Sequence, residues 1–468
     1  MAMIELGEAN ERSPVAGGPG WNWRATRRLW PFGLALLALL TLTAAAPARR
    51  APEATIRINI GATSIVQGGE AIFVIDPLGT AGVPNPHVVA FRLPGAEPLW
   101  RVPVPIAATP AGQAVAGGVP VGAYVADGAP LLLSANPETG DVPRTVALDT
   151  ATGRTRWDRP GGFASFTIEG AALLWDAPPT IRDAATEAVE PAGTLRAVDP
   201  ATGAERWAYP VPARTQLSYH PDGRNHPDGT DRVDLVVLWT RDEPVRLLDA
   251  TTGRIAGTLA PPVEPPRNIA ARVGESTGYW SGVQVVGDLL MLLGPDQTTL
   301  TAYGLARLDR RWTVQRDPKT EFWLDSCGAY PCFRRPQGGV RVLDPATGRT
   351  LWTDGSPRFL WPVGDYLLAG DMIFERAAPM TALETRTGRV VGELGTWALL
   401  DQPDQRGPRL VLRQKPSGKA WLAELDPSTA TSRVLMELSD ISGGCVVYRT
   451  VFTCRRLDGS TALWPIPE

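Results

Sequence analysis

Asp149-Thr-Ala-Thr-Gly-Arg-Thr-Arg-Trp157 is the clearest copy of a segment that recurs along this chain. Asp199–Trp207 and Asp344–Trp352 repeat it almost letter for letter. In each copy an apolar run precedes the aspartate, and a second strand-like run carries the tryptophan. Such a unit cannot bury its apolar face alone, so neighbouring copies must stack on one another. The recurrence therefore decides the architecture.

Nine segments of the chain carry a version of this turn, at spacings of 32 to 57 residues. A second apolar run lies upstream of most copies, as in Val363-Gly-Asp-Tyr-Leu-Leu368. Short antiparallel strands at this spacing build small sheets, and a series of four-stranded sheets is typical of a β-propeller. We therefore predict an all-β propeller over residues 56–468, with eight blades favoured, seven as the alternative, and both chain ends sharing one blade. The aspartate position falls at Arg92, Asp149, Asp199, Asp249, Gly304, Asp344, Glu384, Asp426 and near Asp458.

Each recurring residue has a structural explanation. The aspartate accepts a backbone N–H and starts the turn, the glycine supplies a positive φ, and the tryptophan ring fills the seam with the next sheet. A catalytic site would occur in one or two copies rather than in most, so the pattern predicts a scaffold and no catalytic residue. The clearest positions are Asp149, Gly153, Trp157, Asp199, Gly203, Trp207, Asp344, Gly348 and Trp352.

Charge argues against one class of partner. The 468 residues carry a net charge of −3, and residues 1–50 contain six arginines against three glutamates. The remainder is therefore acidic and shows no basic stripe, which argues against nucleic-acid binding.

An apolar run predicts attachment to a membrane. Leu29 to Ala46 carries no charge and approaches the ~20 residues needed to cross a bilayer core. Four arginines precede the run and two follow it, which favours a cytoplasmic N-terminus. The predicted order is a disordered cytoplasmic tail (1–28), a transmembrane helix (29–46), a linker (47–55) and a propeller outside the cytoplasm.

A cleaved signal peptide is the alternative for this run, because Ala46-Pro-Ala48 resembles a small-residue cleavage site. The run is longer than the usual ~7–15 residues of a signal peptide, which favours a retained anchor. Both interpretations place the main domain outside the cytoplasm.

Four cysteines predict two disulfides in an oxidising compartment. Cys327 and Cys332 lie five residues apart, and Cys445 and Cys454 lie nine apart. The local pairs are the simplest of three possible connectivities. Zinc binding is disfavoured because neither pair has Cys-x-x-Cys spacing and no histidine lies nearby.

The insertion at residues 208–231 repeats His-Pro-Asp-Gly. His220, Asp222, His226 and Asp228 could gather around a metal. Two consecutive polar turns are the favoured explanation, because Pro-Asp-Gly is turn chemistry already. We therefore predict no metal site.

The repeat resembles that of the pyrroloquinoline-quinone-like β-propellers, which include quinoprotein alcohol dehydrogenases and BamB-type outer-membrane assembly lipoproteins. The similarity is strong at Ala147–Trp157, Ala197–Trp207 and Val342–Trp352. It implies eight blades docked by tryptophan. The family's enzymes place a vicinal Cys-Cys beside the quinone and BamB-type proteins carry a lipidated cysteine, and this sequence contains neither. Glycine or valine replaces the tryptophan in three copies, at Gly257, Gly392 and Val434.

These observations predict a membrane-anchored extracytoplasmic propeller that acts as a non-catalytic binding or scaffold module for a protein or cell-envelope ligand. No cofactor is expected, and the oligomeric state is open. The alternative is a quinone-dependent dehydrogenase or another small-molecule enzyme that uses the central funnel. A sensor that signals through residues 1–28 ranks last, because that tail contains no recognisable signalling motif.

Overall fold

The structure is a computed structural model, and the residues it describes form β-strands joined by turns. All described strands belong to the unit formed by residues 50–468. The described residues are 54–56, 64–76, 86–106, 121–126, 128–135, 143–177, 192–221, 232–240, 243–260, 283–294, 298–317, 319–321, 323–335, 338–356, 359–370, 377–400, 409–415 and 418–466.

The predicted membrane segment lies outside these residues. The tail (1–28), the apolar run (29–46) and the linker up to residue 53 are not among the described parts. Within the described parts, no helix is long and apolar enough to cross a membrane.

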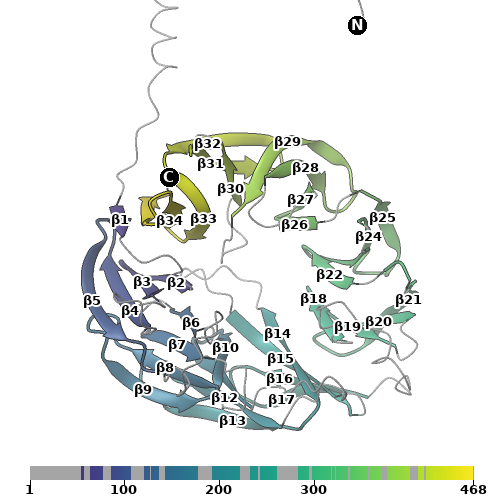
Figure 1. The fold of residues 1–468 in the computed structure, drawn as a ribbon. Helices are drawn as coiled ribbons and strands as arrows, with labels where there is room; N and C mark the ends of the chain where they lie inside the picture. The colour runs from purple at the N-terminus through teal and green to yellow at the C-terminus, as the bar shows by residue number, and fades with distance from the viewer. Residues whose placement is uncertain are drawn as a thin grey trace, which may run out of the picture. The chain divides into compact units, whose positions relative to one another are not determined.

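The strands form four-stranded antiparallel sheets, which we call blades, arranged around a common axis (Figure 1). The first strand of each blade lies innermost and the fourth outermost. Blade 1 contains β2 (Ser64–Gly68), β3 (Ala71–Asp76), β4 (His87–Arg92) and β5 (Glu97–Pro103). Blade 2 contains β6 (Val121–Tyr124), β7 (Leu131–Ala135), β8 (Arg144–Leu148) and β9 (Thr155–Pro160). Blade 3 contains β10 (Gly162–Thr167), β11 (Ala172–Asp176), β12 (Gly193–Val198) and β13 (Glu205–Val211).

The middle of the chain repeats this arrangement. Blade 4 contains β14 (Thr215–Pro221), β15 (Arg232–Thr240), β16 (Val245–Asp249) and β17 (Ile255–Leu259). Blade 5 contains β18 (Val283–Val286), β19 (Leu289–Leu293), β20 (Thr299–Gly304) and β21 (Arg310–Gln315). Blade 6 contains β22 (Trp323–Cys327), β23 (Tyr330–Arg334), β24 (Val340–Leu343) and β25 (Thr350–Asp354).

The last three blades use the remaining strands and the first one. Blade 7 contains β26 (Phe359–Val363), β27 (Tyr366–Gly370), β28 (Ala378–Glu384) and β29 (Val390–Leu399). Blade 8 contains the end of β29, β30 (Arg409–Gln414), β31 (Ala420–Asp426) and β32 (Thr431–Leu438). Blade 9 contains β33 (Ile441–Tyr448), β34 (Val451–Arg456), β35 (Thr461–Pro465) and β1 (Ala54–Ile56).

The described strands thus make nine blades, which corrects the predicted eight and the alternative of seven. Five blades are separate sheets. Blades 3 and 4 join in one sheet because β10 pairs with β15 in parallel. Blades 7 and 8 share β29, whose Val390–Trp397 part pairs with β28 and whose Ala398 and Leu399 pair with β30. A shared strand hides a blade boundary from the sequence pattern, because no turn marks it.

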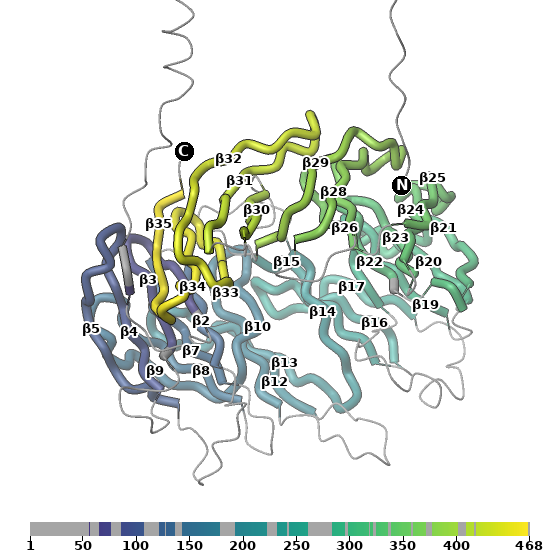
Figure 2. The backbone as a smooth tube through the Cα atoms, turned by 45° about the horizontal axis from the view of Figure 1, so that its top comes forward, coloured from purple at the N-terminus to yellow at the C-terminus, as the bar shows by residue number. Residues whose placement is uncertain are grey.

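The two ends of the strand sequence close the ring, as predicted. β1 pairs with β35 in antiparallel register, with Ala54 opposite Leu463. Figures 1 and 2 show the last, yellow strands next to the first, purple ones. Blade 1 then meets blade 9 through a side-chain contact, because Gln67 Nε2 donates to Thr450 Oγ1 at 2.7 Å and Thr450 N donates to Gln67 Oε1 at 3.2 Å. The ring is therefore held by strand pairing and by hydrogen bonds between distant residues.

The segment near Asp458, predicted as the ninth copy of the repeat, is not equivalent to the others. Asp458 lies in the turn between β34 and β35, the second and third strands of blade 9. In the other eight copies the turn connects the third and fourth strands. Blade 9 has no such turn because its fourth strand, β1, comes from the opposite end of the described chain.

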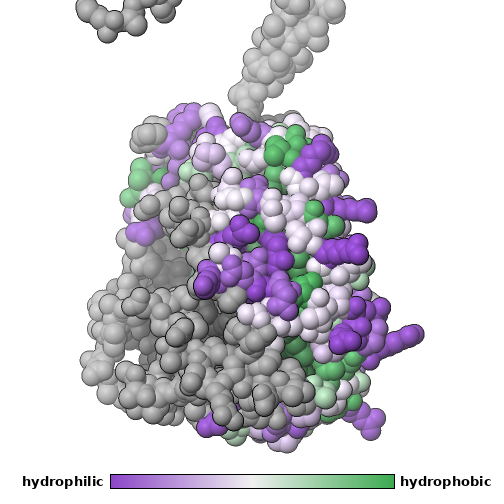
Figure 3. Space-filling model, turned by 90° about the vertical axis from the view of Figure 1, so that its right-hand side faces the viewer, coloured by the Kyte–Doolittle hydropathy of each residue, from purple (hydrophilic) through white to green (hydrophobic). Residues whose placement is uncertain are grey.

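The hydrophobic core lies at the seams between blades. Nine clusters of buried residues each combine side chains from two neighbouring blades, including the closing seam, where Ile56 and Leu463 pack with Ile72 and Val74. The side of the molecule in Figure 3 shows hydrophilic residues standing out with hydrophobic ones scattered between them. Each blade is therefore stabilised mainly by its neighbours, as expected for a repeat architecture.

Candidate functional site

The recurring aspartates organise the turn between the third and fourth strands, which we call the repeat turn. Asp149 Oδ1 accepts hydrogen bonds from the backbone N–H groups of Ala151 and Thr152 and from the Thr152 hydroxyl. The N–H of Gly153, where φ is 70°, donates to the Asp149 carbonyl at 2.8 Å. Asp199 forms the same pattern in blade 3, and Asp344 accepts from Ala346 N in blade 6.

The recurring tryptophans dock each blade onto the repeat turn of the next. Trp157 of blade 2 is 8% exposed, and its Nε1 donates to the carbonyl of Pro200 in blade 3 at 2.8 Å. The same contact occurs at five seams, always to the residue after the aspartate position. Its other members are Trp100 to Thr150 O at 2.9 Å, Trp207 to Ala250 O at 3.2 Å, Trp312 to Pro345 O at 2.8 Å and Trp352 to Thr385 O at 2.8 Å.

The turn glycines leave room for these rings. A Cβ at Gly203 would lie 2.6 Å from Cγ of Trp157, closer than real side chains approach. Each of the five docked turns has a glycine whose Cβ would meet the incoming indole at 2.5 to 2.7 Å. Glycine is therefore needed here for space as well as for its positive φ. The recurring tryptophans and glycines form a scaffold that joins neighbouring blades.

The described part of the ring lacks this docking at four seams. Gly257 replaces the tryptophan between blades 4 and 5, Gly392 between blades 7 and 8, and Val434 between blades 8 and 9. The fourth is the closing seam. Where a repeat turn receives no indole, a side chain takes the glycine position, at Leu308, Ala430 and Ala96, with φ of 54°, 51° and 58°. Indole and turn side chain exclude each other because both need the same space.

The turn carboxylate is also held in its ionised form. A hydrogen bond from Arg156, and then one from the Thr152 hydroxyl, lower the pKa of Asp149 from 3.8 to about 2. In the unfolded chain the pKa of this carboxyl group is ~3.9. Because its pKa is lower in the folded protein, the ionised carboxylate stabilises the fold at higher pH. This stabilisation is lost as the pH falls toward the folded-state pKa.

We expect Asp149→Asn to weaken the acid sensitivity of the protein. The wild-type unfolding midpoint should fall as the pH drops from about 4 to 2, and the variant should fall less steeply because it loses one titrating group. Urea unfolding at several pH values in this window measures both slopes. Parallel slopes for the two proteins would contradict the assignment.

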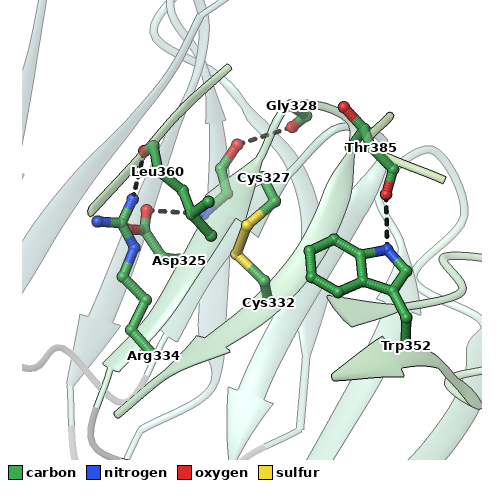
Figure 4. Close-up of a disulfide and its surroundings, with 9 residues drawn as sticks. Asp325, Cys327, Gly328, Cys332, Arg334, Trp352, Leu360 and Thr385 are labelled. Atoms are coloured by element: carbon green, nitrogen blue, oxygen red, sulfur yellow. Dashed lines mark hydrogen bonds and ion pairs between the residues drawn. A yellow bond between two sulfur atoms is a disulfide. The ribbon is translucent and has the colours of Figure 1, made fainter. Parts of the chain in front are cut away.

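Both predicted disulfides are present. Cys327 bonds to Cys332 across the β22–β23 hairpin, and Cys445 bonds to Cys454 across β33 and β34. The first pair is buried against blade 7 (Figure 4). Beside it, Arg334 bridges blades 6 and 7, because its Nε pairs with Asp325 at 2.6 Å and its Nη2 donates to the Leu360 carbonyl at 2.9 Å. The described chain contains no free cysteine.

Of the four side chains considered as metal ligands, the structure describes one. His220 is described, and its Nδ1 lies 2.7 Å from Asp234 Oδ1 while its Nε2 lies 3.1 Å from the Gly287 carbonyl of blade 5. Asp222, His226 and Asp228 lie outside the described residues. No group of metal-ligating side chains occurs in the described part. His220 joins blades 4 and 5 at a seam that lacks tryptophan docking.

A groove of about 530 Å³ opens at the seam between blades 7 and 8. Residues 363–366, the turn between β26 and β27, form one wall. Residues 424–428, Thr431 and Arg433 of blade 8 form the other. This is one of the seams where the indole is missing, so the chain leaves a concave surface beside an undocked repeat turn.

The groove combines negative charge with apolar patches. Asp365, Glu424 and Asp426 carry carboxylates, and Arg433 Nη2 pairs with Glu424 Oε2 at 2.7 Å. Hydrogen bonds from Ser428, and then from Thr429, lower the pKa of Asp426, so this carboxylate stays ionised. Val363 and Tyr366 are half-buried, whereas Leu425 and Pro427 are buried beneath the groove. The carboxylates of the groove thus outnumber its one guanidinium, that of Arg433.

Asp426 and the segment from Val363 entered the sequence prediction only as parts of the repeat, and no groove was predicted there. The signal in the sequence was a double departure from the repeat, because the tryptophan position is Gly392 and the facing glycine position is Ala430. Either substitution alone, Gly392 or Ala430, is indistinguishable from ordinary sequence variation between copies of the repeat. Their pairing across a seam is visible only when blades 7 and 8 are known to be neighbours.

Fold and docking define the chain as a tryptophan-docked β-propeller. Residues 85–278 match the family model described as outer membrane protein assembly factor BamB. Over these residues the chain is similar to the PQQ-like, BamB-like β-propellers, which supports the resemblance noted in the sequence.

The solved structures that match this chain share little sequence with it. BamB from Moraxella catarrhalis is 14% identical, with 71% of this chain and 93% of that chain covered and a TM-score of 0.36. A europium-containing methanol dehydrogenase is 15% identical, with 79% and 73% covered and a TM-score of 0.36. The computationally designed Ika8 protein is 11% identical, with 88% and 99% covered and a TM-score of 0.40. No curated protein sequence matches the chain.

Proposed function

We propose that the protein is a non-catalytic β-propeller that is anchored in a membrane by residues 29–46 and binds a partner protein outside the cytoplasm. The groove between blades 7 and 8 is the observation that carries this proposal. It offers a concave surface with more carboxylates than guanidinium groups, at a seam where the scaffold provides no docking indole. Loops and rims of propellers suit broad partners.

The location rests on three independent features. The apolar run 29–46 is preceded by four arginines, which favours a cytoplasmic N-terminus. Two disulfides close hairpins in blades 6 and 9, and disulfides persist in oxidising compartments. The family model matched by residues 85–278 is described as an outer membrane protein assembly factor. Together they support a propeller that works in the cell envelope with other proteins.

Cross-linking of the full-length chain in native membranes tests the proposal. A photo-reactive residue at position 428, at the rim of the groove, should yield a discrete cross-linked partner protein. The matched control carries the same residue at position 346, because Ala346 and Ser428 both lie two residues after the aspartate position, and the control seam is filled by Trp312. Absence of a cross-linked protein at position 428 would contradict the proposal.

Reconstitution with a quinone tests the enzymatic alternative. The purified chain, incubated with pyrroloquinoline quinone and calcium, should show no bound chromophore and no alcohol- or sugar-oxidising activity. Stoichiometric quinone binding with turnover would replace the proposed binding function by a dehydrogenase.

A further inference from the structure

The first strand enters the ring from one particular face. β1 runs antiparallel to β35, the third strand of blade 9. β35 ends beside the β33–β34 turn, because Ile466 N donates to the Thr450 carbonyl at 2.9 Å. The chain therefore enters β1 at the position that a repeat turn takes in the other blades. We call this side, which carries the repeat turns and the turns between first and second strands, the repeat-turn face.

The chain between the apolar run and β1 is short. Only residues 47–53 lie between the run, which ends at Ala46, and β1, which begins at Ala54. Fully extended, these steps span at most about 29 Å. If residues 29–46 cross a membrane, the headgroup layer takes about 5–8 Å of that length. The start of β1 then lies within about 25 Å of the membrane surface.

This length favours one orientation of the ring. A strand of five or six residues spans about 17–20 Å. With the opposite face toward the bilayer, the connecting residues would have to cover this height as well as the headgroups, which uses nearly all of their length. With the repeat-turn face toward the bilayer, the same residues lead directly from the membrane into β1.

The groove between blades 7 and 8 opens on the same face. One wall is the β26–β27 turn, and the other includes the repeat turn of blade 8. Thr385 N donates to the Asp365 carbonyl at 3.0 Å, so the two kinds of turn lie side by side in blade 7. Blade 8 is also the neighbour of blade 9, with which it shares a core that contains Leu422 and Phe452 (Figure 1). The groove therefore lies one blade away from β1.

The length of the connection also restricts the partner. A small folded domain is about 30 Å across. This is wider than the ~25 Å that the chain allows between the start of β1 and the membrane surface. A soluble domain does not fit into such a gap, whereas an extracytoplasmic segment of a protein in the same membrane reaches it directly.

We infer that the repeat-turn face lies toward the membrane and that the groove binds the extracytoplasmic part of an integral membrane protein. The inference rests on the proposed anchor and binding function. It adds the orientation of the ring and the class of the partner.

Energy transfer to the bilayer tests the orientation. The full-length chain is reconstituted in liposomes that contain an acceptor-labelled lipid, with a fluorescent amino acid at position 428 or 439. Ser428 and Ser439 are both exposed, and they lie beyond opposite ends of β32 (Thr431–Leu438). Transfer should be at least about twofold more efficient from position 428, because a strand of this length separates the two positions by about 25 Å.

A longer connection is the matched control. Insertion of about 30 Gly-Ser residues after Ala51 gives a flexible linker with an r.m.s. length near 30 Å. The difference between the two positions should then shrink, while urea unfolding of the ring stays unchanged. Equal transfer from positions 428 and 439 without the insertion, or stronger transfer from position 439, overturns the inference.

The membrane cross-linking experiment tests the class of partner. The protein that cross-links at position 428 should stay in the membrane pellet at high pH when it is not cross-linked. A partner that is released into the soluble fraction would leave the binding function standing and overturn this inference. Release of the chain itself at high pH, or absence of any cross-linked protein, would contradict the proposed function instead.

Discussion

Trp157→Ala should lower the free energy of unfolding by about 3–5 kcal/mol, the range for large aromatic truncations in a core. The ring is 8% exposed and belongs to the core shared by blades 2 and 3. Its loss leaves a cavity at the seam and removes the hydrogen bond to the Pro200 carbonyl. Equilibrium unfolding in urea, followed by circular dichroism and by tryptophan fluorescence, measures the change.

Two further substitutions separate the contributions at this seam. Trp157→Phe keeps an aromatic ring but removes the N–H, so it should cost less than Trp157→Ala. Trp421→Ala removes a tryptophan that is only partly buried, with Lys415 Nζ 3.5 Å from its ring centroid. It should also cost less, because less surface leaves the core. Equal losses for Trp157→Ala and Trp421→Ala would show that the Trp157 ring does not dock the blades.

Gly203→Ala should destabilise the protein by about 2–4 kcal/mol, because it combines backbone strain with overpacking. The residue has a φ of 71°, a conformation that costs an L-residue roughly 1–2 kcal/mol. The added methyl would also meet the Trp157 ring at 2.6 Å. Urea unfolding of the variant beside the wild type measures the loss.

Ala430→Gly is the opposite substitution at a turn that receives no indole. Ala430 has a φ of 51°, so glycine relieves backbone strain there while it removes one small side chain. The expected change is within about 1 kcal/mol of the wild type. A loss in Ala430→Gly as large as that in Gly203→Ala would show that the turn position, and not the docked ring, determines the effect.

The repeat pattern was sufficient to predict the fold class. Most units carry a turn with an aspartate and a glycine, often with a tryptophan on the next strand, and these residues act locally or on the adjacent unit. Local hydrogen bonds of Asp149 and the contact of Trp157 with Gly203 explain why a sequence pattern of short range describes a propeller. Both disulfides were predictable for the same reason, since each links residues of one hairpin.

The blade number was not predictable in this way. β29 passes from blade 7 to blade 8 without a turn, so the pattern contains no break at that boundary. β1 completes blade 9 by pairing with β35 at the other end of the strand sequence. Whether two such distant strands can pair depends on the packing angles between all the intervening blades. No single residue or local motif determines the total of these angles.

The sequence by itself determined the repeating unit, its turn chemistry and the way each blade holds the next. Only the tertiary structure decided how many blades close the ring and which departures from the repeat face each other. Gly392 and Ala430 lie 38 positions apart in the chain, yet they pack at one seam. The groove between Asp365 and Asp426 lies at the same seam, and it too is formed by residues of two blades that meet only in the folded chain.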